Sequence, residues 1–107
     1  MSTPNEFHNV SVSCKANIYF EGRVISRGLT LDNGQKITLG LIFPGQYSFN
    51  TAAPERMAIV TGSCTYRLAG ASSWSDCVAG SYFEVPGNAS FDIAVDEGIT
   101  EYICSFG

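Results

Sequence analysis

The chain has 107 residues, a length that accommodates a single domain, and its 45% hydrophobic content is enough for a folded core. Its net charge of −4 and its six scattered Lys and Arg residues exclude nucleic acid and anionic membranes as main partners, because binding phosphate backbones requires a basic patch. Residues 1–10 lack the basic and apolar regions of an export signal, and no apolar stretch reaches membrane-spanning length. We therefore expect a cytoplasmic protein.

Taken in chain order, the sequence predicts a loose leader over residues 1–15 and one domain over residues 16–107. Within this domain, short runs of strand-forming residues alternate with turns rich in Gly, Pro, Asn and Asp. Asp32-Asn33-Gly34 is typical of a hairpin turn, because Asn and Gly readily adopt its positive φ angles. The predicted strands are 18–26, 29–31, 36–43, 46–51, 56–61, 64–68, 74–78, 81–85, 89–95 and 99–106.

Alternation within these strands indicates which side chains share a face. No window keeps the apolar period of a helix for three turns. Many short strands joined by hairpins predict an all-β sandwich or barrel, and closure into a barrel also removes exposed sheet edges. The residues expected to share a face are Tyr47, Phe49 and Thr51 in one strand, Phe91, Ile93 and Val95 in another, and Tyr102, Cys104 and Phe106 in the last.

The cysteines Cys14, Cys64, Cys77 and Cys104 contain no C-x-x-C pair. Such spacing does not indicate a zinc site, and a reducing cytosol disfavours disulfides. We interpret them mostly as small buried residues.

Two segments resemble the two halves of the cupin signature. The first begins at Gly45 and keeps a glutamate at Glu55 and a glycine at Gly62, but Thr51 and Ala53 stand at its two histidine places. The resemblance implies a cupin-like antiparallel barrel or jelly roll.

The second segment begins at Gly80 and keeps Pro86 after a gap of five residues, and Phe91 stands at the place of the third histidine. A metal site needs three or four converging donor atoms, and only Glu55 and the Thr51 hydroxyl remain. The only histidine, His8, lies in the leader, where we interpret it as solvated. The sequence therefore predicts no metal and no cofactor.

A narrower resemblance covers residues 17–107. The runs Tyr19-Phe-Glu-Gly-Arg-Val24, Phe49-Asn-Thr-Ala-Ala-Pro-Glu-Arg-Met57 and Gly80-Ser-Tyr-Phe-Glu-Val-Pro-Gly-Asn88 are similar to the small cupin-type pyrimidine/purine nucleoside phosphorylases of bacteria. The resemblance implies a homodimeric enzyme that cleaves diverse ribonucleosides with inorganic phosphate into free base and ribose 1-phosphate.

Such phosphorolysis requires donors for phosphate, a group that stabilises the oxocarbenium-like sugar, and a surface for the leaving base. Glu55 and Arg23 are the predicted catalytic residues. For phosphate, we single out Arg23 and Arg56, with Arg67 third; the alternative for each is a solvated surface cation. Glu55 either binds ribose hydroxyls inside the barrel or is a turn carboxylate after Pro54.

Aromatic residues are the candidates for binding the base. Tyr47, Phe49 and Phe91 either form a pocket on which any base can stack or belong to the ordinary core. Asn88 and Tyr102 are expected to hydrogen-bond base or sugar, and the alternative for Asn88 is a turn residue. Thr51 is also predicted to bind the substrate. Trp74 is interpreted as surface packing or a dimer contact.

Two rival readings use the same barrel. One is a non-catalytic cupin that binds a sugar or small metabolite without an organised phosphate site. The other is a structural or regulatory dimer whose cavity is filled by phenylalanine and tyrosine side chains. A phosphate or sulfate ion beside Arg23 or Arg56 would favour the enzyme.

Overall fold

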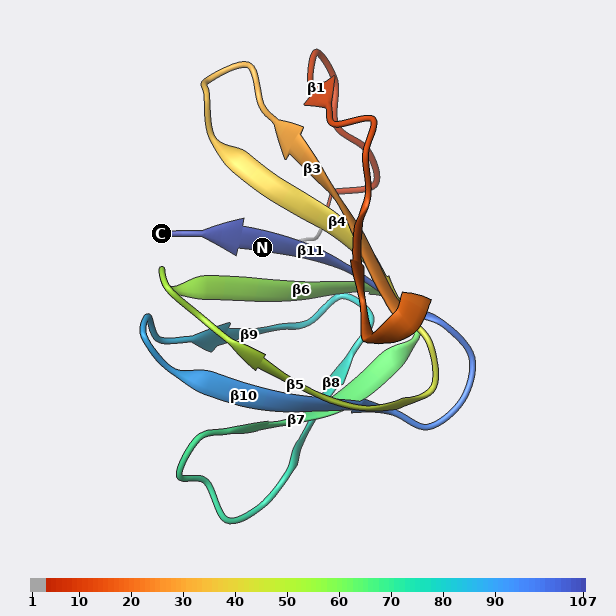
Figure 1. Cartoon of the computed structure of the whole chain (residues 1–107), viewed down its shortest axis with the longest axis vertical. Helices are drawn as coiled ribbons and strands as arrows, with labels where there is room; N and C mark the ends of the chain where they lie inside the picture. The colour runs from red at the N-terminus through yellow and green to blue at the C-terminus, as the bar shows by residue number, and fades with distance from the viewer. Residues whose placement is uncertain (1–3) are drawn as a thin grey trace.

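The computed structural model describes residues 4–107, and antiparallel strands form almost all of its regular structure (Figure 1). A short 3-10 turn, η1, interrupts them between the second and third strands. The elements are β1 (Ser11–Val12), β2 (Asn17–Tyr19), η1 (Phe20–Gly22), β3 (Val24–Thr30), β4 (Lys36–Ile42), β5 (Gly45–Asn50), β6 (Glu55–Thr61), β7 (Ser63–Leu68), β8 (Ser75–Val78), β9 (Tyr82–Val85), β10 (Ser90–Val95) and β11 (Thr100–Phe106).

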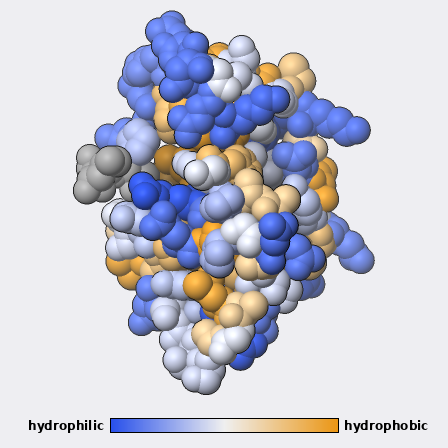
Figure 2. Space-filling model, turned by 90° about the vertical axis from the view of Figure 1, so that its left-hand side faces the viewer, coloured by the Kyte–Doolittle hydropathy of each residue, from blue (hydrophilic) through white to orange (hydrophobic). Residues whose placement is uncertain are grey.

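The strands form two sheets that pack face to face (Figure 1). The larger sheet has the order β1-β3-β4-β11-β6-β9, with β2 paired to the edge of β3, and the smaller sheet has the order β5-β10-β7-β8. Val24, Ile59 and Ile93 are fully buried between the sheets. The end of the molecule at which β11 terminates presents small apolar areas among hydrophilic side chains (Figure 2).

This architecture confirms the all-β, cupin-like prediction. The strands from β4 to β11 lie within about one residue of the predicted ranges, since alternation and turn residues are local signals. The predicted faces are also confirmed: Phe91, Ile93 and Val95 are all buried.

The predicted strand 18–26 is wrong. Phe20, Glu21 and Gly22 have φ angles of 52°, 58° and 93°, so the chain turns sharply and returns as β3. Two consecutive non-glycine residues in the left-handed region are unusual, and Gly22 was the local signal for this turn. The predicted short strand 29–31 belongs to the same β3, which runs unbroken through Gly28 to Thr30.

The described part of the leader is not loose. Ser11 and Val12 form β1 by pairing with the end of β3. Phe7 and Val10 pack on an outer apolar cluster of the larger sheet, whose buried members are Leu29, Ile37 and Ile103. His8 is exposed as expected, with Nε2 3.2 Å from Glu6 Oε1. In residues 4–107, no helix is long and apolar enough to cross a membrane.

All four cysteines are free, and three of them are buried, which confirms their interpretation as small core residues. Cys64 and Cys77 face each other across β7 and β8, and Cys104 lies on β11. Cys14 is exposed.

Candidate active site

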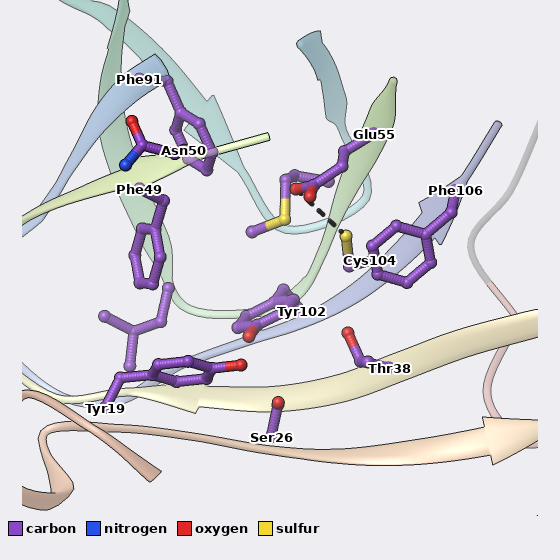
Figure 3. A pocket seen from close by; sticks show the side chains of 12 residues that line it. Tyr19, Ser26, Thr38, Phe49, Asn50, Glu55, Phe91, Tyr102, Cys104 and Phe106 are labelled. Atoms are coloured by element: carbon purple, nitrogen blue, oxygen red, sulfur yellow. Dashed lines mark hydrogen bonds between the residues drawn. The ribbon is translucent and has the colours of Figure 1, made fainter. Parts of the chain in front are cut away.

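A cavity of about 200 Å³ lies inside the barrel between the two sheets (Figure 3). Its walls come from strands that are distant in sequence, including β2, β3, β4, β5, β6, β10 and β11. The lining residues are Tyr19, Ser26, Thr38, Ile42, Phe49, Asn50, Glu55, Met57, Phe91, Tyr102, Cys104 and Phe106.

Glu55 is the one charged side chain among these lining residues. It is the first residue of β6, and alternation directs Glu55, Met57 and Ile59 inward. The Cys104 thiol donates a hydrogen bond to Glu55 Oε1 at 3.6 Å (Figure 3). Partial burial raises the pKa of Glu55, an effect that this hydrogen bond opposes. Burial, together with the charge of Glu55, raises the pKa of Cys104 to about 12, so the thiol keeps its proton.

Tyr102 lies across the floor of the cavity because its partner position is a glycine. The register pairs Tyr102 on β11 with Gly40 on β4. A Cβ atom at Gly40 would overlap the ring and hydroxyl of Tyr102. Burial raises the pKa of Tyr102, so its hydroxyl remains protonated at neutral pH.

Phe49 and Phe91, two of the residues predicted to stack a base, form an aromatic side of the cavity. Their ring centroids lie 5.7 Å apart with an interplanar angle of 26°. Tyr19 contacts Phe49 edge to face at 5.9 Å, and Phe83 supports Phe91 from the core at 5.8 Å. Cross-strand pairing of Phe49 with Phe91 explains their proximity.

Four hydroxyl groups project into the cavity from one side (Figure 3). We call this set the hydroxyl wall: Tyr19, Ser26, Thr38 and Tyr102. Only Tyr102 of this set was predicted from the sequence as a site residue. Tyr19 was present in the family-like run that begins at residue 19, but nothing local distinguishes Ser26 or Thr38 from other strand hydroxyls. Asn50 and Cys104 were also not singled out as site residues.

Three predicted substrate-binding residues have structural roles instead. The Tyr47 hydroxyl donates to the carbonyl oxygens of Phe43 at 2.7 Å and Pro44 at 3.0 Å, and its ring lies in the core. The Thr51 hydroxyl donates to the carbonyl of Pro86 at 2.7 Å, which joins the end of β5 to the turn between β9 and β10.

Asn88 has a φ of 51° and is exposed in the turn before β10, where the turn alternative placed it. The backbone N–H of Asn88 donates to the carbonyl of Ala52 at 3.1 Å. Tyr47, Thr51 and Asn88 are absent from the cavity lining.

The predicted phosphate ligands also lie outside the cavity. Arg23 is exposed after η1. Arg56 points to the outer face of β6, where Nη2 lies 3.4 Å from Glu84 Oε2 and the guanidinium lies 4.4 Å from the Tyr82 ring centroid. Glu55 and Arg56 are neighbours in one strand, so they face opposite sides of the sheet.

Arg67, the third candidate, lies on the outer face of the smaller sheet. Its Nη2 is 2.9 Å from Asp92 Oδ2, and its guanidinium lies 4.7 Å above the Trp74 ring. This contact fits the interpretation of Trp74 as surface packing. The hydrogen bonds from Ser48 and Arg67 lower the pKa of Asp92.

The residues at the cupin metal places do not fit a metal ion. Thr51 is engaged with backbone carbonyls, Ala53 has no donor atom, and Phe91 is an aromatic wall. Across residues 4–107, no three His, Cys, Asp or Glu side chains gather in a way that could hold a metal.

Comparison with known proteins identifies the family. Residues 14–106 match the profile of the family described as pyrimidine/purine nucleoside phosphorylase. The chain belongs to this family. A pyrimidine/purine nucleoside phosphorylase of Polaromonas sp. (strain JS666) is 52% identical over 101 residues, covering 92% of this chain and 94% of the relative. Another from Aromatoleum aromaticum is 47% identical over the whole of both chains.

Solved structures share the fold of this chain. A protein of unknown function from Acinetobacter sp. ADP1 superposes with a TM-score of 0.92 at 38% identity, covering 95% of this chain and 98% of that one. A cupin-2 domain from Rhodospirillum rubrum superposes with a TM-score of 0.68 at 12% identity, covering 97% of this chain and 73% of that one. The second likeness shows the cupin fold alone.

Proposed function

We propose that this protein is a nucleoside phosphorylase that cleaves diverse pyrimidine and purine nucleosides with inorganic phosphate. The products are the free base and ribose 1-phosphate. One observation carries the proposal: a single carboxylate, Glu55, enters a cavity bounded by Phe49 and Phe91, in a chain of the phosphorylase family.

The aromatic side suits the base. Stacking uses the π-face that every base possesses, so Phe49 and Phe91 would accept purines and pyrimidines alike. Phe91 is held by Phe83, and Phe83 stacks on Tyr66 at 3.9 Å. A rigid aromatic surface loses little conformational entropy on binding.

Glu55 suits the ribose. A carboxylate only accepts hydrogen bonds, and ribose hydroxyls donate them. As the glycosidic bond breaks, positive charge develops at the anomeric carbon, and a partly desolvated carboxylate stabilises that charge more strongly than an exposed one. In this proposal Glu55 orients the sugar and stabilises the transition state, and the thiol of Cys104 holds its carboxyl group toward the cavity.

Base release measured by chromatography tests the function. Metal-stripped protein should release uracil from uridine and hypoxanthine from inosine only when phosphate is present. Glu55→Gln should lower kcat about 100-fold or more, the scale of removing one transition-state electrostatic group. Glu101→Gln on the outer face of β11 is the matched control and should leave kcat unchanged. If folded wild-type protein releases no base, a sugar-binding cupin becomes the better account.

Homodimerisation and a cytoplasmic location are part of this proposal. The outer face of the larger sheet exposes Leu39 and Val60 beside a shallow apolar hollow, a surface that favours association. The buried free thiols suit a reducing compartment. Sedimentation of the purified protein would test the dimer.

A further inference from the structure

The reaction requires a phosphate site, and the described lining of the cavity offers no cationic side chain for it. Lys and Arg are absent from its described lining, and Glu55 is an acceptor that would repel phosphate at close range. Phosphate oxygens accept hydrogen bonds, so they need donors. Neutral donors suffice where they are preorganised and screened from water, because the local dielectric strengthens each hydrogen bond.

The cavity separates acceptors from donors. Figure 3 shows the carboxylate of Glu55 on one side and the hydroxyl wall on the opposite side. The wall is assembled from β2, β3, β4 and β11, whereas Glu55 comes from β6. A nucleoside between them would present ribose hydroxyls to Glu55 and leave the hydroxyl wall to an acceptor-rich group.

The hydroxyls of the wall are available as donors. The Asn17 side-chain amide donates to Ser26 Oγ at 3.2 Å, and the Ser26 hydroxyl is itself hydrogen-bonded to Tyr102. One O–H of this hydroxyl pair is therefore left to donate to a ligand. Ser26 is 4% exposed, so a ligand bound there is largely shielded from water. Tyr102 keeps its proton because burial raises its pKa. Tyr19, half-exposed at the edge of the cavity, completes the set.

We propose that the hydroxyl wall of Tyr19, Ser26, Thr38 and Tyr102 binds the phosphate co-substrate through neutral hydrogen-bond donors. This inference rests on the phosphorylase function proposed above and assigns its phosphate subsite. Phosphate bound there lies opposite Glu55, with the aromatic side of Phe49 and Phe91 left for the base.

The reaction then balances without a further reactant. An oxygen of hydrogen phosphate forms a bond to the anomeric carbon, and the bond from that carbon to the base nitrogen breaks. The electron pair leaves with the base, and the proton carried by hydrogen phosphate ends on the base. The hydroxyl wall contributes orientation and hydrogen bonds to the phosphate oxygens.

A competing phosphate site is the polar hollow on the other side of Glu55, which Arg56 and Glu84 line. Phosphate affinity at a guanidinium site depends on attraction between opposite charges, so it weakens as ionic strength rises. Phosphate affinity at a site of neutral donors changes much less with ionic strength. Salt dependence of the phosphate KM therefore separates the two sites.

Separate KM values for phosphate and uridine test the inference. Tyr102→Phe and Ser26→Ala each remove one donor to a charged ligand, a loss of about 1.5–3 kcal/mol, so the phosphate KM should rise about 10- to 100-fold. The uridine KM should change less than about threefold, since a difference of that size is below 1 kcal/mol. Thr38→Val, which keeps the side-chain shape, is the second variant in case Tyr102→Phe does not fold.

Tyr82→Phe is the matched control, because Tyr82 lies on the outer face beneath Arg56. Its phosphate KM should equal that of the wild type. The inference is overturned if the hydroxyl variants raise only the uridine KM, or if Arg56→Gln raises the phosphate KM and the hydroxyl variants do not. An inactive wild type would refute the proposed function itself, so the two failures are distinct.

Discussion

Replacing Gly40 with alanine adds one methyl group at the position that Tyr102 occupies. Gly40 and Tyr102 are both buried, and they pair directly between β4 and β11. The new Cβ would overlap ring carbons and the hydroxyl of Tyr102, so the tyrosine has to move. Gly28→Ala on the neighbouring β3 is the matched control, because its Cβ would meet only Ser13 Oγ at an ordinary 3.5 Å.

The opposite signs of the two substitutions follow from these contacts. Overpacking a core costs about 1–3 kcal/mol, whereas Gly→Ala at a compatible position gains about 0.4–1 kcal/mol through the unfolded chain. For 107 residues, one kcal/mol corresponds to about 4 °C in Tm. We therefore expect Gly40→Ala to lower Tm by about 4–12 °C and Gly28→Ala to raise it by about 2–4 °C.

Calorimetry and steady-state kinetics check this prediction together. Displacement of the Tyr102 hydroxyl should raise the phosphate KM of Gly40→Ala by about tenfold, the cost of one weakened hydrogen bond to an anion. The double variant Gly40→Ala/Tyr102→Ala should be more stable than the sum of its single changes, since removing the ring removes the clash. Equal Tm and phosphate KM for Gly40→Ala and Gly28→Ala would refute the reasoning.

Three further predictions concern charge, core and metal. Partial burial raises the pKa of Glu55 from its ordinary value of 4.5, so the folded protein holds this proton more tightly than the unfolded chain. The free energy of unfolding should consequently fall as pH rises from 4.5 through the folded-state pKa of Glu55. In thermal melts, the Tm of Glu55→Gln should exceed that of the wild type only above this pH range. Ile93→Ala should cost about 2–5 kcal/mol in urea unfolding, while Ile99→Ala, 44% exposed, should cost far less. Activity should survive dialysis against a chelator, and loss restored by a divalent cation would contradict a metal-free site.

The cavity explains how a cupin barrel can serve a different chemistry. Thr51 and Phe91 occupy places where histidines would hold a metal, and their side chains now join a turn and form an aromatic wall. In place of side chains that converge on a metal, the cavity therefore has an aromatic stacking surface and a set of hydroxyl groups. The remaining carboxylate, Glu55, points inward because it shares one face of β6 with Met57 and Ile59.

Strand alternation separates Glu55 from Arg56. Adjacent residues of a strand face opposite sides, so Glu55 and Arg56 could not both have entered the cavity. Choosing Glu55 as inward already excluded Arg56. Gly22 likewise indicated a turn inside the predicted strand 18–26, and its positive φ confirms that signal.

The sequence by itself determined the all-β class, most strand ranges, the family and the inward positions of Phe49 and Phe91, and it left Glu55 open between the barrel interior and a turn. These follow from local alternation, turn residues and motifs, each of which spans only a few positions. Only the tertiary structure decided that Tyr19 and Ser26 share a cavity with them and that the arginines do not. The physical reason is that a cavity is built by pairing between distant strands, and register across a sheet cannot be read from any one strand alone.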